Sequence, residues 1–406
     1  MKALLEKILK GVSSKKFVLV LGFLGLYLLS TGTSWAIFSY LRQEPDQQSE
    51  ALTGLAEARS KINLGLPRES ECPINGGMFT EVEKNIWEKR RPIAAILENH
   101  VESRPPSGIS RADIVYEAVA EGGITRFLAI FYCGAVAEEL NIAPVRSVRV
   151  YFIDWAAEYG DKPIFMHVGG ANDFSGTGET VRAARALELL ATLGWRVAKG
   201  NDFDTTYDSG FPIFWRNYER LGRPVATEHT MTASLDAAYK EAEKRGFAAK
   251  DSEGISWDEN FVSWRFEDDR KVTPPEVTNI SFGFWSNKPD YDVEWTYDAA
   301  ENRYLRRNGG KEHIDLDTGT QLSAKNVVVM FVRERASVDK NKHLLYTTVG
   351  SGRALVFQNG RVVEGTWNKD AREARTIFLD SSGKEIPLVR GVSWIEIIPA
   401  GKKVDY

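Results

Sequence analysis

The chain has 406 residues, of which 43% are hydrophobic and 27% are charged, and its formal net charge is −4 at pH 7. This length leaves room for two domains, and the composition is ordinary for a globular protein. Because a surface that follows nucleic-acid phosphates needs an excess of basic residues, the net charge argues against general nucleic-acid binding.

The first 41 residues predict where the protein resides. Residues 1–16 carry five lysines and one glutamate, whereas residues 17–41 carry no charge. A helix of about 20 apolar residues spans the hydrocarbon core of a bilayer, and flanking lysines keep their end in the cytoplasm. We therefore predict a cytoplasmic basic segment at 1–16, a transmembrane anchor at 17–41, and a single-pass protein of the cell membrane whose bulk is extracytoplasmic.

A cleaved signal peptide is the alternative to a retained anchor. Ser34 and Ala36 would then be the small residues before the cleavage site. The long uncharged run and the lack of an A-x-A sequence favour the anchor. No cysteine directly follows the apolar run, which argues against lipid modification of the N-terminus.

Cys72 and Cys133 are the only two cysteines of the chain. An even pair in an exported protein predicts a disulfide. Such a bond would close a loop of about 60 residues and contribute about 4 kcal/mol in the chain-entropy model. Two separate buried thiols are the alternative.

The remaining chain predicts a linker followed by two domains. Residues 42–71 are polar and form the predicted linker. In residues 72–250, strands are predicted at 92–98, 114–120, 124–133 and 162–170, and helices at 147–159, 180–193 and 233–245. Strands that alternate with helices indicate an α/β or α+β domain, and we expect Thr232 to cap the last helix.

Residues 251–406 have a different pattern. Short runs of β-branched and aromatic residues recur there, separated by Gly, Asn and Asp. This pattern predicts an all-β second domain, either a sandwich or an open barrel.

Charged residues interrupt apolar segments between Arg90 and Phe152. Glu98 and His100 follow the end of a predicted strand, so they could act as a general base and a proton carrier, or bind a metal with another carboxylate. Alternatively, His100 caps a turn and Glu98 pairs with an arginine.

Three carboxylates, those of Asp113, Glu117 and Glu121, are spaced so that a regular strand would place them on one face. Paired carboxylates suit glycoside cleavage. Structural ion pairs with nearby arginines are the alternative.

The arginines of this segment are the best candidates for ligand binding. Arg146, Ser147 and Arg149 lie at a predicted junction between a loop and a helix, where backbone N–H groups and guanidinium groups favour an anion. With Arg126 they could hold a phosphate, a carboxylate or an acidic sugar. Alternatively, these arginines are partners of Glu117 or Glu121.

The histidines and the search for known catalytic motifs give little evidence for a metal site or for catalysis. His167 ends a predicted strand, and with His100 and His229 it could supply three imidazoles. No HExxH or similar spacing is present, so the sequence predicts no metal site, and it also predicts no cofactor. No GxSxG elbow is present, and neither cysteine has the surroundings of a nucleophile.

Several long segments resemble one family. They are RPIAAILENH, RPPSGISRADIVYE, AEGGITRFLAIF, PVRSVRVYF and HVGG, followed by DLDTGTQLSAKNVVVMFV and VEGTWNK. They resemble the YerB-like family of exported bacterial proteins (domain of unknown function 3048), over about Cys72 to Pro399. The resemblance implies a membrane-attached extracytoplasmic protein with two domains and no settled biochemical activity.

This chain departs from the family pattern at three places. It lacks the anchoring cysteine of lipoprotein members, has Ala143 where the family tends to have Gly, and has EHTMTAS where many members have a His-Asn pair. The first departure argues against lipid modification, and the others argue against transferring details of loop geometry.

Two functional hypotheses follow. In the first, the exported region binds an anionic cell-envelope ligand, and hydrolysis of an envelope glycan or phosphoester is a further interpretation. The catalytic candidates are Glu98, His100 and Glu121, and the ligand-binding candidates are Arg126, Arg146, Ser147, Arg149 and His167. In the second, the charges form a buried network and the protein is a scaffold that contacts another envelope protein.

Overall fold

The structure is a computed structural model that describes residues 15–41, 55–62 and 65–406. It divides into two compact units, Met1–Lys61 and Ile62–Tyr406. Parts of the predicted basic segment (1–14) and of the predicted linker (42–54 and 63–64) lie outside the described residues.

The first unit contains helix α2, Lys15–Leu41, which covers the predicted membrane anchor. Residues 55–60 are also helical. Within the residues that the structure describes, no helix reaches the combined length and apolarity of a membrane span.

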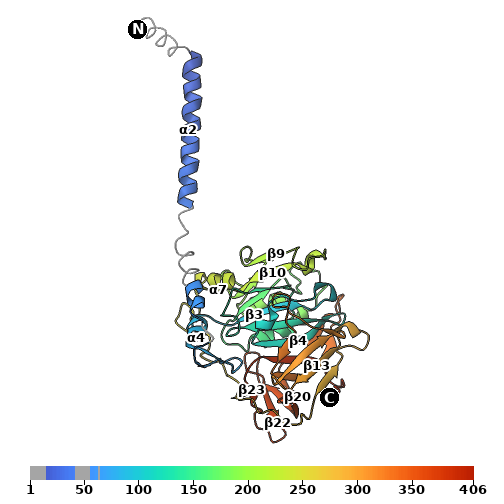
Figure 1. Ribbon diagram of the computed structural model, residues 1–406. Coiled ribbons are helices and arrows are strands. Elements are labelled where there is room, and N and C mark those ends of the chain that lie inside the picture. Colours follow the sequence, from blue (N-terminus) through green and yellow to red (C-terminus); the bar gives the residue numbers. More distant parts are fainter. Residues whose placement is uncertain (1–14, 42–54, 63–64) are drawn as a thin grey trace. The chain divides into compact units, whose positions relative to one another are not determined.

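A ten-stranded sheet organises the second unit (Figure 1). Its order is β22-β21-β20-β17-β24-β4-β5-β3-β7-β8. The strands are β3 Ile93–Glu98, β4 Ile114–Glu121, β5 Ile124–Phe131, β7 Ile164–His167, β8 Asp202–Asp204, β17 Asn326–Val332, β20 Gly350–Gln358, β21 Arg361–Lys369, β22 Ile377–Asp380 and β24 Ser393–Pro399. Strand β24 pairs in parallel with both β17 and β4, so the predicted domains 72–250 and 251–406 contribute to one sheet.

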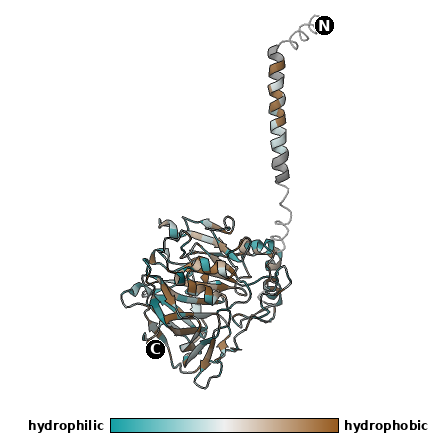
Figure 2. Ribbon diagram, turned by 180° about the vertical axis from the view of Figure 1, so that it is seen from behind, coloured by the Kyte–Doolittle hydropathy of each residue, from teal (hydrophilic) through white to brown (hydrophobic). Residues whose placement is uncertain are grey.

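Both faces of this sheet are covered. Every residue of β3 and β17 is buried, as expected for strands that pack on two sides. On one face, Trp155 of helix α5 (Val150–Ala156) stacks on Tyr116 of β4 with ring centroids 5.8 Å apart. On the other face, Trp295 meets Trp394 of β24 edge to face at 5.4 Å. Apolar residues accordingly gather in the central strands (Figure 2).

The layer that contains Trp295 is a second, antiparallel sheet with the order β12-β13-β14-β15, and β16 also pairs with β14. Its strands are β12 Asn279–Phe282, β13 Val293–Asp298, β14 Arg303–Asn308, β15 Lys311–Glu312 and β16 Ser323–Ala324. The mixed α and β content and the mainly β C-terminal part confirm the predicted fold class.

Smaller elements complete the unit. The strand groups are β1 Arg68–Glu71 with β2 Met78–Thr80, β6 Asn141–Ile142 with β10 Met231–Ser234 and β9 Phe214–Arg216, β11 Phe266–Glu267 with β23 Leu388–Val389, and β18 Glu334–Ala336 with β19 Leu344–Tyr346. The short helices are α4 Glu81–Trp87, η1 Val101–Ser103, η2 Ile109–Arg111, η4 Thr227–His229 and η5 Pro289–Tyr291.

The helices of the first predicted domain are shorter than expected. Helix α5 begins at Val150 rather than Ser147, because Val148 pairs with Gly170 and holds the preceding residues extended. The predicted helix 180–193 is divided into η3 (Arg182–Ala184) and α6 (Ala186–Thr192), since Arg185 has a ψ of 87° that no helix accommodates.

The cap of helix α7, Leu235–Lys244, is Ser234 and not the predicted Thr232. The hydroxyl of Ser234 accepts a hydrogen bond from the backbone N–H of Ala237 at 3.2 Å. Thr232 instead pairs with Trp215 across strands β10 and β9, so it belongs to a sheet.

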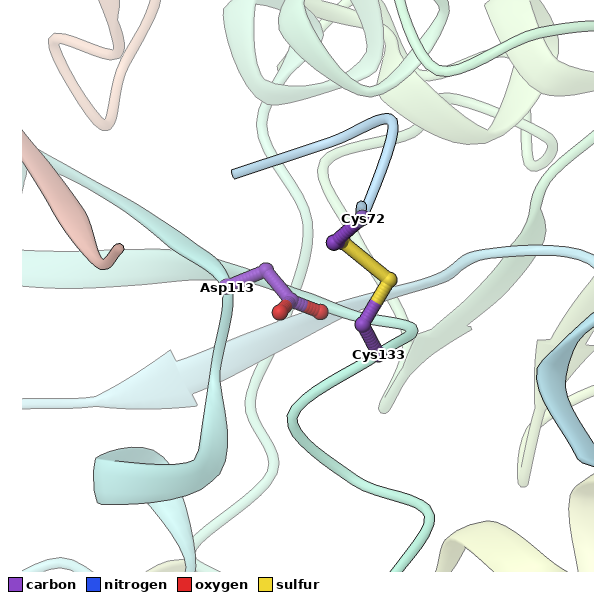
Figure 3. Close-up of side chains that lie close together, drawn as sticks. All are labelled: Cys72, Asp113 and Cys133. Atoms are coloured by element: carbon purple, nitrogen blue, oxygen red, sulfur yellow. A yellow bond between two sulfur atoms is a disulfide. The ribbon is translucent and has the colours of Figure 1, made fainter. Parts of the chain in front are cut away.

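The predicted disulfide between Cys72 and Cys133 is confirmed, with 6.1 Å between the Cα atoms. It ties the segment before β2 to the end of β5. The carboxylate of Asp113 lies beside this bond (Figure 3). Because both sulfur atoms are bonded to each other, this group offers no thiolate to a metal ion.

Candidate functional site

A cavity of about 300 Å³ opens where strand β3 ends and the β4–β5 hairpin turns. We call it the Glu98 cleft. Five of the predicted site residues line it: Glu98, His100, Glu121, Arg126 and Arg146. Three further charged or titratable residues line it as well: Glu102, Glu228 and His229.

Four segments of the chain meet at the cleft: the end of β3, the β4–β5 turn, the loop of Arg146, and residues 226–229. Glu98 is the last residue of β3 and pairs with Arg126 of β5. The β4–β5 turn uses Gly122 and Gly123, whose φ angles of 55° and 83° favour glycine. The loop of Arg146 runs beside β3, with the Arg146 backbone N–H donating to the Ile96 carbonyl at 2.9 Å.

The carboxylate of Glu98 is the central group of the cleft. Its side chain is only 4% exposed, and a buried carboxylate is costly unless it is paired. Its Oε1 lies 3.0 Å from Nε of Arg146, and its Oε2 lies 2.7 Å from Nδ1 of His229. Both oxygens are therefore engaged, which suits an orienting role better than attack on a substrate.

The imidazoles of His100 and His229 stack, with ring centroids 4.7 Å apart and an angle of 14° between the planes. His100 caps η1, where its Nδ1 accepts a hydrogen bond from the Glu102 backbone N–H at 3.2 Å, as the turn-cap alternative predicts. Burial, and then the neighbouring His229, lower the pKa of His100, so the neutral ring is favoured.

The carboxylate beside His229 decides which ring nitrogen carries the proton. Because an ionised carboxylate only accepts, Nδ1 of His229 is the donor in its contact with Glu98. Nε2 lies 3.6 Å from Oε2 of Glu102. Nε2 is therefore the ring nitrogen that faces the exposed carboxylate of Glu102.

Arg126 and Arg149 are buried and hold the wall of the cleft together. Arg126 donates to the Ser147 carbonyl at 2.7 Å and lies 3.7 Å from Glu121, and burial lowers its pKa to about 10. Arg149 donates to the Val148 carbonyl at 2.7 Å and forms an ion pair with Glu121, and burial lowers its pKa as well. These contacts are those of the structural alternative, in which both arginines are partners of Glu121.

Arg146 differs from its two neighbours because its side chain is 25% exposed. Its Nε faces Glu98, so the contact with a buried carboxylate fixes the orientation of the guanidinium. Of the two predicted ligand-binding residues that line the cleft, Arg126 and Arg146, Arg146 has the more exposed side chain.

His167 lies outside the cleft and is fully buried. Its Nε2 contacts Oδ1 of Asp202 at 2.6 Å, and its Nδ1 lies 2.9 Å from the Gly169 carbonyl. Burial opposes the charge on this ring, but Asp202 outweighs that effect and raises the pKa of His167. Its ring is covered and both of its nitrogens have partners within the fold, so His167 is not among the residues that line the cleft.

The three carboxylates expected on one face are separated. The pairing of β4 with β5 shifts register between Val119 and Glu121, so the regular alternation ends before Glu121. Glu117 is buried in an ion pair with Arg306 and accepts a hydrogen bond from Asn99 at 3.0 Å. The alternative in which Glu117 pairs with the nearby arginines is therefore wrong, because its partner is Arg306. Of the three carboxylates, Glu121 is the one that lines the cleft.

Sequence reasoning missed two of the charged residues in the cleft, Glu102 and Glu228, and gave His229 only a minor place. Residues 228–234 had stood out as the EHTMTAS departure from the family pattern. Nothing in the sequence joined that segment to Glu98, because 131 positions separate Glu98 from His229.

Comparisons with known proteins identify relatives across most of the chain. Residues 79–248 match a family model described as "Protein of unknown function (DUF3048) N-terminal domain", and residues 280–395 match the corresponding C-terminal domain. "Putative lipoprotein YerB" of Bacillus subtilis (strain 168) is 30% identical over 332 residues, which cover 82% of this chain and 87% of that protein. The crystal structure of YerB protein from Bacillus subtilis has a TM-score of 0.64 and 27% identity, and the match covers 83% of this chain and 100% of that one.

Proposed function

The chain belongs to the DUF3048 family of proteins of unknown function, and we propose that it is a membrane-attached, extracytoplasmic protein that binds a small anionic ligand in the Glu98 cleft. The envelope surrounding such a protein offers carboxylate-bearing and phosphate-bearing fragments as ligands.

Three observations support the location. The relative from Bacillus subtilis is named as a lipoprotein, and lipoproteins are held at a membrane. In this chain, we infer that the uncharged run 17–41, preceded by lysines, takes the place of a lipid anchor. The bond between Cys72 and Cys133 fits an oxidising compartment outside the cytoplasm.

The exposure and orientation of Arg146 carry the proposal for ligand binding. A guanidinium recognises carboxylate and phosphate groups through two parallel hydrogen bonds. Nε of Arg146 lies 3.0 Å from Glu98, and the partly exposed side chain of Arg146 lines the cleft. This contact reduces the conformational freedom that a ligand would otherwise have to remove.

A binding screen with the full-length protein in detergent tests the proposal. The probes are muropeptides, teichoic-acid fragments and phosphosugars. We expect one of these classes to bind and Arg146→Ala to weaken that binding by at least about tenfold, the effect of losing one charge-assisted hydrogen bond. Arg353→Ala is the matched control, because Arg353 is 52% exposed and does not line the cleft.

Two results would contradict ligand binding at Arg146. One is that none of the three probe classes binds. The other is that Arg146→Ala binds as well as the wild type while its melting temperature is unchanged.

A scaffold that contacts another envelope protein is the second candidate. It is favoured by the burial of Arg126, Arg149 and Glu117, whose charges are used within the fold. Chemical cross-linking of the full-length protein in its own membrane tests this candidate. A specific cross-linked partner that persists in Arg146→Ala would support it, and the absence of any partner would contradict it.

A further inference from the structure

Three side chains in the Glu98 cleft bring together atom types that bind metal ions. A nitrogen of His100, a carboxylate oxygen of Glu102 and a nitrogen of His229 all lie within 4.8 Å of one another. Zinc binds nitrogen and oxygen ligands at about 2.0 to 2.2 Å in a tetrahedron, which places ligand atoms about 3.3 to 3.6 Å apart. Nε2 of His229 and Oε2 of Glu102 are already 3.6 Å apart.

We propose that His100, Glu102 and His229 bind a divalent transition-metal ion such as Zn²⁺. This inference departs from the expectation that the sequence contains no metal site. The expectation rested on motif spacing, whereas His229 reaches the other two residues from a distant part of the chain.

The contact between His229 and Glu98 is a second, independent indication of a metal site. Histidines that bind metals commonly donate the proton of their other nitrogen to a carboxylate, which fixes the tautomer and increases the basicity of the ligand nitrogen. Here Nδ1 donates to Glu98 at 2.7 Å, and Nε2 is left to face Glu102. Glu98 is itself held by Arg146 at 3.0 Å, so the ring of His229 is oriented before any ion arrives.

The other two ligands have to move to face one ion, and the ring of His100 must turn out of its nearly parallel stack with His229. His100 gives up one weak hydrogen bond, the 3.2 Å contact between its Nδ1 and the Glu102 backbone N–H. The side chain of Glu102 is 61% exposed, so its carboxylate can turn toward an ion without disturbing the core.

The charges that line the cleft also favour a cation. Four glutamates face two arginines there: Glu98, Glu102, Glu121 and Glu228 against Arg126 and Arg146. Two imidazoles with one carboxylate suit zinc and related first-row metals better than Ca²⁺ or Mg²⁺, which prefer oxygen ligands. Three protein ligands leave one tetrahedral position open to the cleft.

The inference does not require the anionic ligand proposed above. If both occur, the metal ion offers an anion a second attachment point in the cleft that contains Arg146. The ion also resolves a difficulty of that proposal, because it offsets the excess of carboxylates that would repel an anion.

Metal titration of the full-length protein tests the inference. The protein is purified in detergent without a histidine tag, stripped with a chelator, and titrated with Zn²⁺ in buffer free of phosphate. We expect saturation at about one ion per chain, with an excess of Mg²⁺ or Ca²⁺ unable to displace it. Co²⁺ in place of Zn²⁺ should give the visible absorption of a nitrogen- and oxygen-ligated site.

Variants assign the site to these residues. Glu102→Gln should weaken zinc binding by at least about tenfold. Even the loss of a residue that only hydrogen-bonds to a metal ligand lowers metal affinity by about 10- to 100-fold. His229→Ala should abolish saturable binding. Glu364→Gln is the matched control, because Glu364 is 60% exposed and lies outside the cleft. Glu102→Gln should fold normally, so its melting temperature without metal should equal that of the wild type.

The inference is overturned if the wild type shows no saturable zinc binding, or if Glu102→Gln binds zinc as tightly as the wild type. In either case His229 is explained as a cation shared between Glu98 and Glu102. Zinc binding without binding of any envelope fragment would leave the metal site in place and reject the proposed ligand function.

Discussion

His229 Nδ1 lies 2.7 Å from Glu98 Oε2, although 131 positions separate the two residues in the chain. The contact fastens helix η4 to the end of strand β3. The other oxygen of Glu98 holds Arg146 at 3.0 Å, so one buried carboxylate fixes two cationic or titratable groups of the cleft. The cleft therefore depends on Glu98 for its shape before any ligand is considered.

Replacing Glu98 should destabilise the protein. In Glu98→Ala, His229 loses a charged hydrogen-bond acceptor and Arg146 loses its ion-pair partner, and we expect the free energy of unfolding to fall by about 1.5 to 3 kcal/mol. Glu98→Gln retains one acceptor and should cost less. Denaturant unfolding measures both variants. The control is Glu228→Gln, an exposed position in the same cleft, where we expect a change within about 0.5 kcal/mol. A similarly small change in Glu98→Ala would show that these contacts contribute little.

Arg306 joins the two large sheets through charges buried between them. Its Nη1 lies 2.9 Å from Glu396 of β24, and its Nη2 contacts Glu117 of β4, with all three side chains fully buried. Burial raises the pKa of Glu396, an effect that Arg306 opposes and Glu117 reinforces. Removal of the one guanidinium would leave two carboxylates without their shared cation.

We expect Arg306→Met to lower the free energy of unfolding by about 3 to 5 kcal/mol, the cost of breaking a buried ion pair. Combining it with Glu117→Gln and Glu396→Gln should recover part of that loss, because no charge is then stranded. Denaturant unfolding at neutral pH compares the single and triple variants. A single variant as stable as the wild type would mean that the carboxylates find other partners.

Local features of the fold could be predicted from the sequence. The apolar run of β3 and the Gly122-Gly123 turn are short-range signals, and both elements form as expected. The pairing of Cys72 with Cys133 was also accessible, because no other cysteine competes. The sequence also predicts a loop at 144–149, and Arg146 of that segment lines the cleft.

Partners distant in the chain could not be predicted. Glu117 meets Arg306 across 189 positions, and no local pattern encodes which of several arginines a buried glutamate will find. The register shift before Glu121 is another such feature, since it depends on how β4 pairs with β5. Thr232 and Ser234 could both cap a helix, and both lie in β10, but Ser234 ends the strand and directly precedes helix α7.

The central position of β24 predicts that the N-terminal half will not fold alone. A fragment of residues 62–250 lacks β24, so the edge of β4 and the apolar side chains beneath Trp394 would be exposed. We expect this fragment to be insoluble or to melt without a cooperative transition. Co-expression with residues 251–406 should restore a soluble complex. Cooperative melting of the fragment by circular dichroism would instead establish an independent domain.

Asp113 makes stability depend on pH near the disulfide. Burial raises its pKa to about 7, although backbone N–H groups of Tyr132 and Gly134 donate to it at 2.7 and 3.0 Å and oppose the rise. In the unfolded chain the pKa of an aspartate is about 3.9. The folded carboxyl keeps its proton to higher pH than the unfolded one. The stability that protonated Asp113 contributes is therefore complete below about pH 4 and is lost as the pH rises through about 7.

Asp113→Asn removes this titration and serves as the reference for measuring it. The free energy of unfolding of both proteins is measured by denaturant between pH 4.5 and 8, a range that extends to both sides of the raised pKa of Asp113. The variant should be less stable at the acidic end, because its amide nitrogen faces backbone N–H groups where an oxygen accepted their hydrogen bonds. The wild type should then lose stability relative to the variant as the pH rises, since ionising a fully buried carboxyl is unfavourable. A difference that stays constant across this range would mean that Asp113 is ionised throughout, with its N–H donors outweighing its burial.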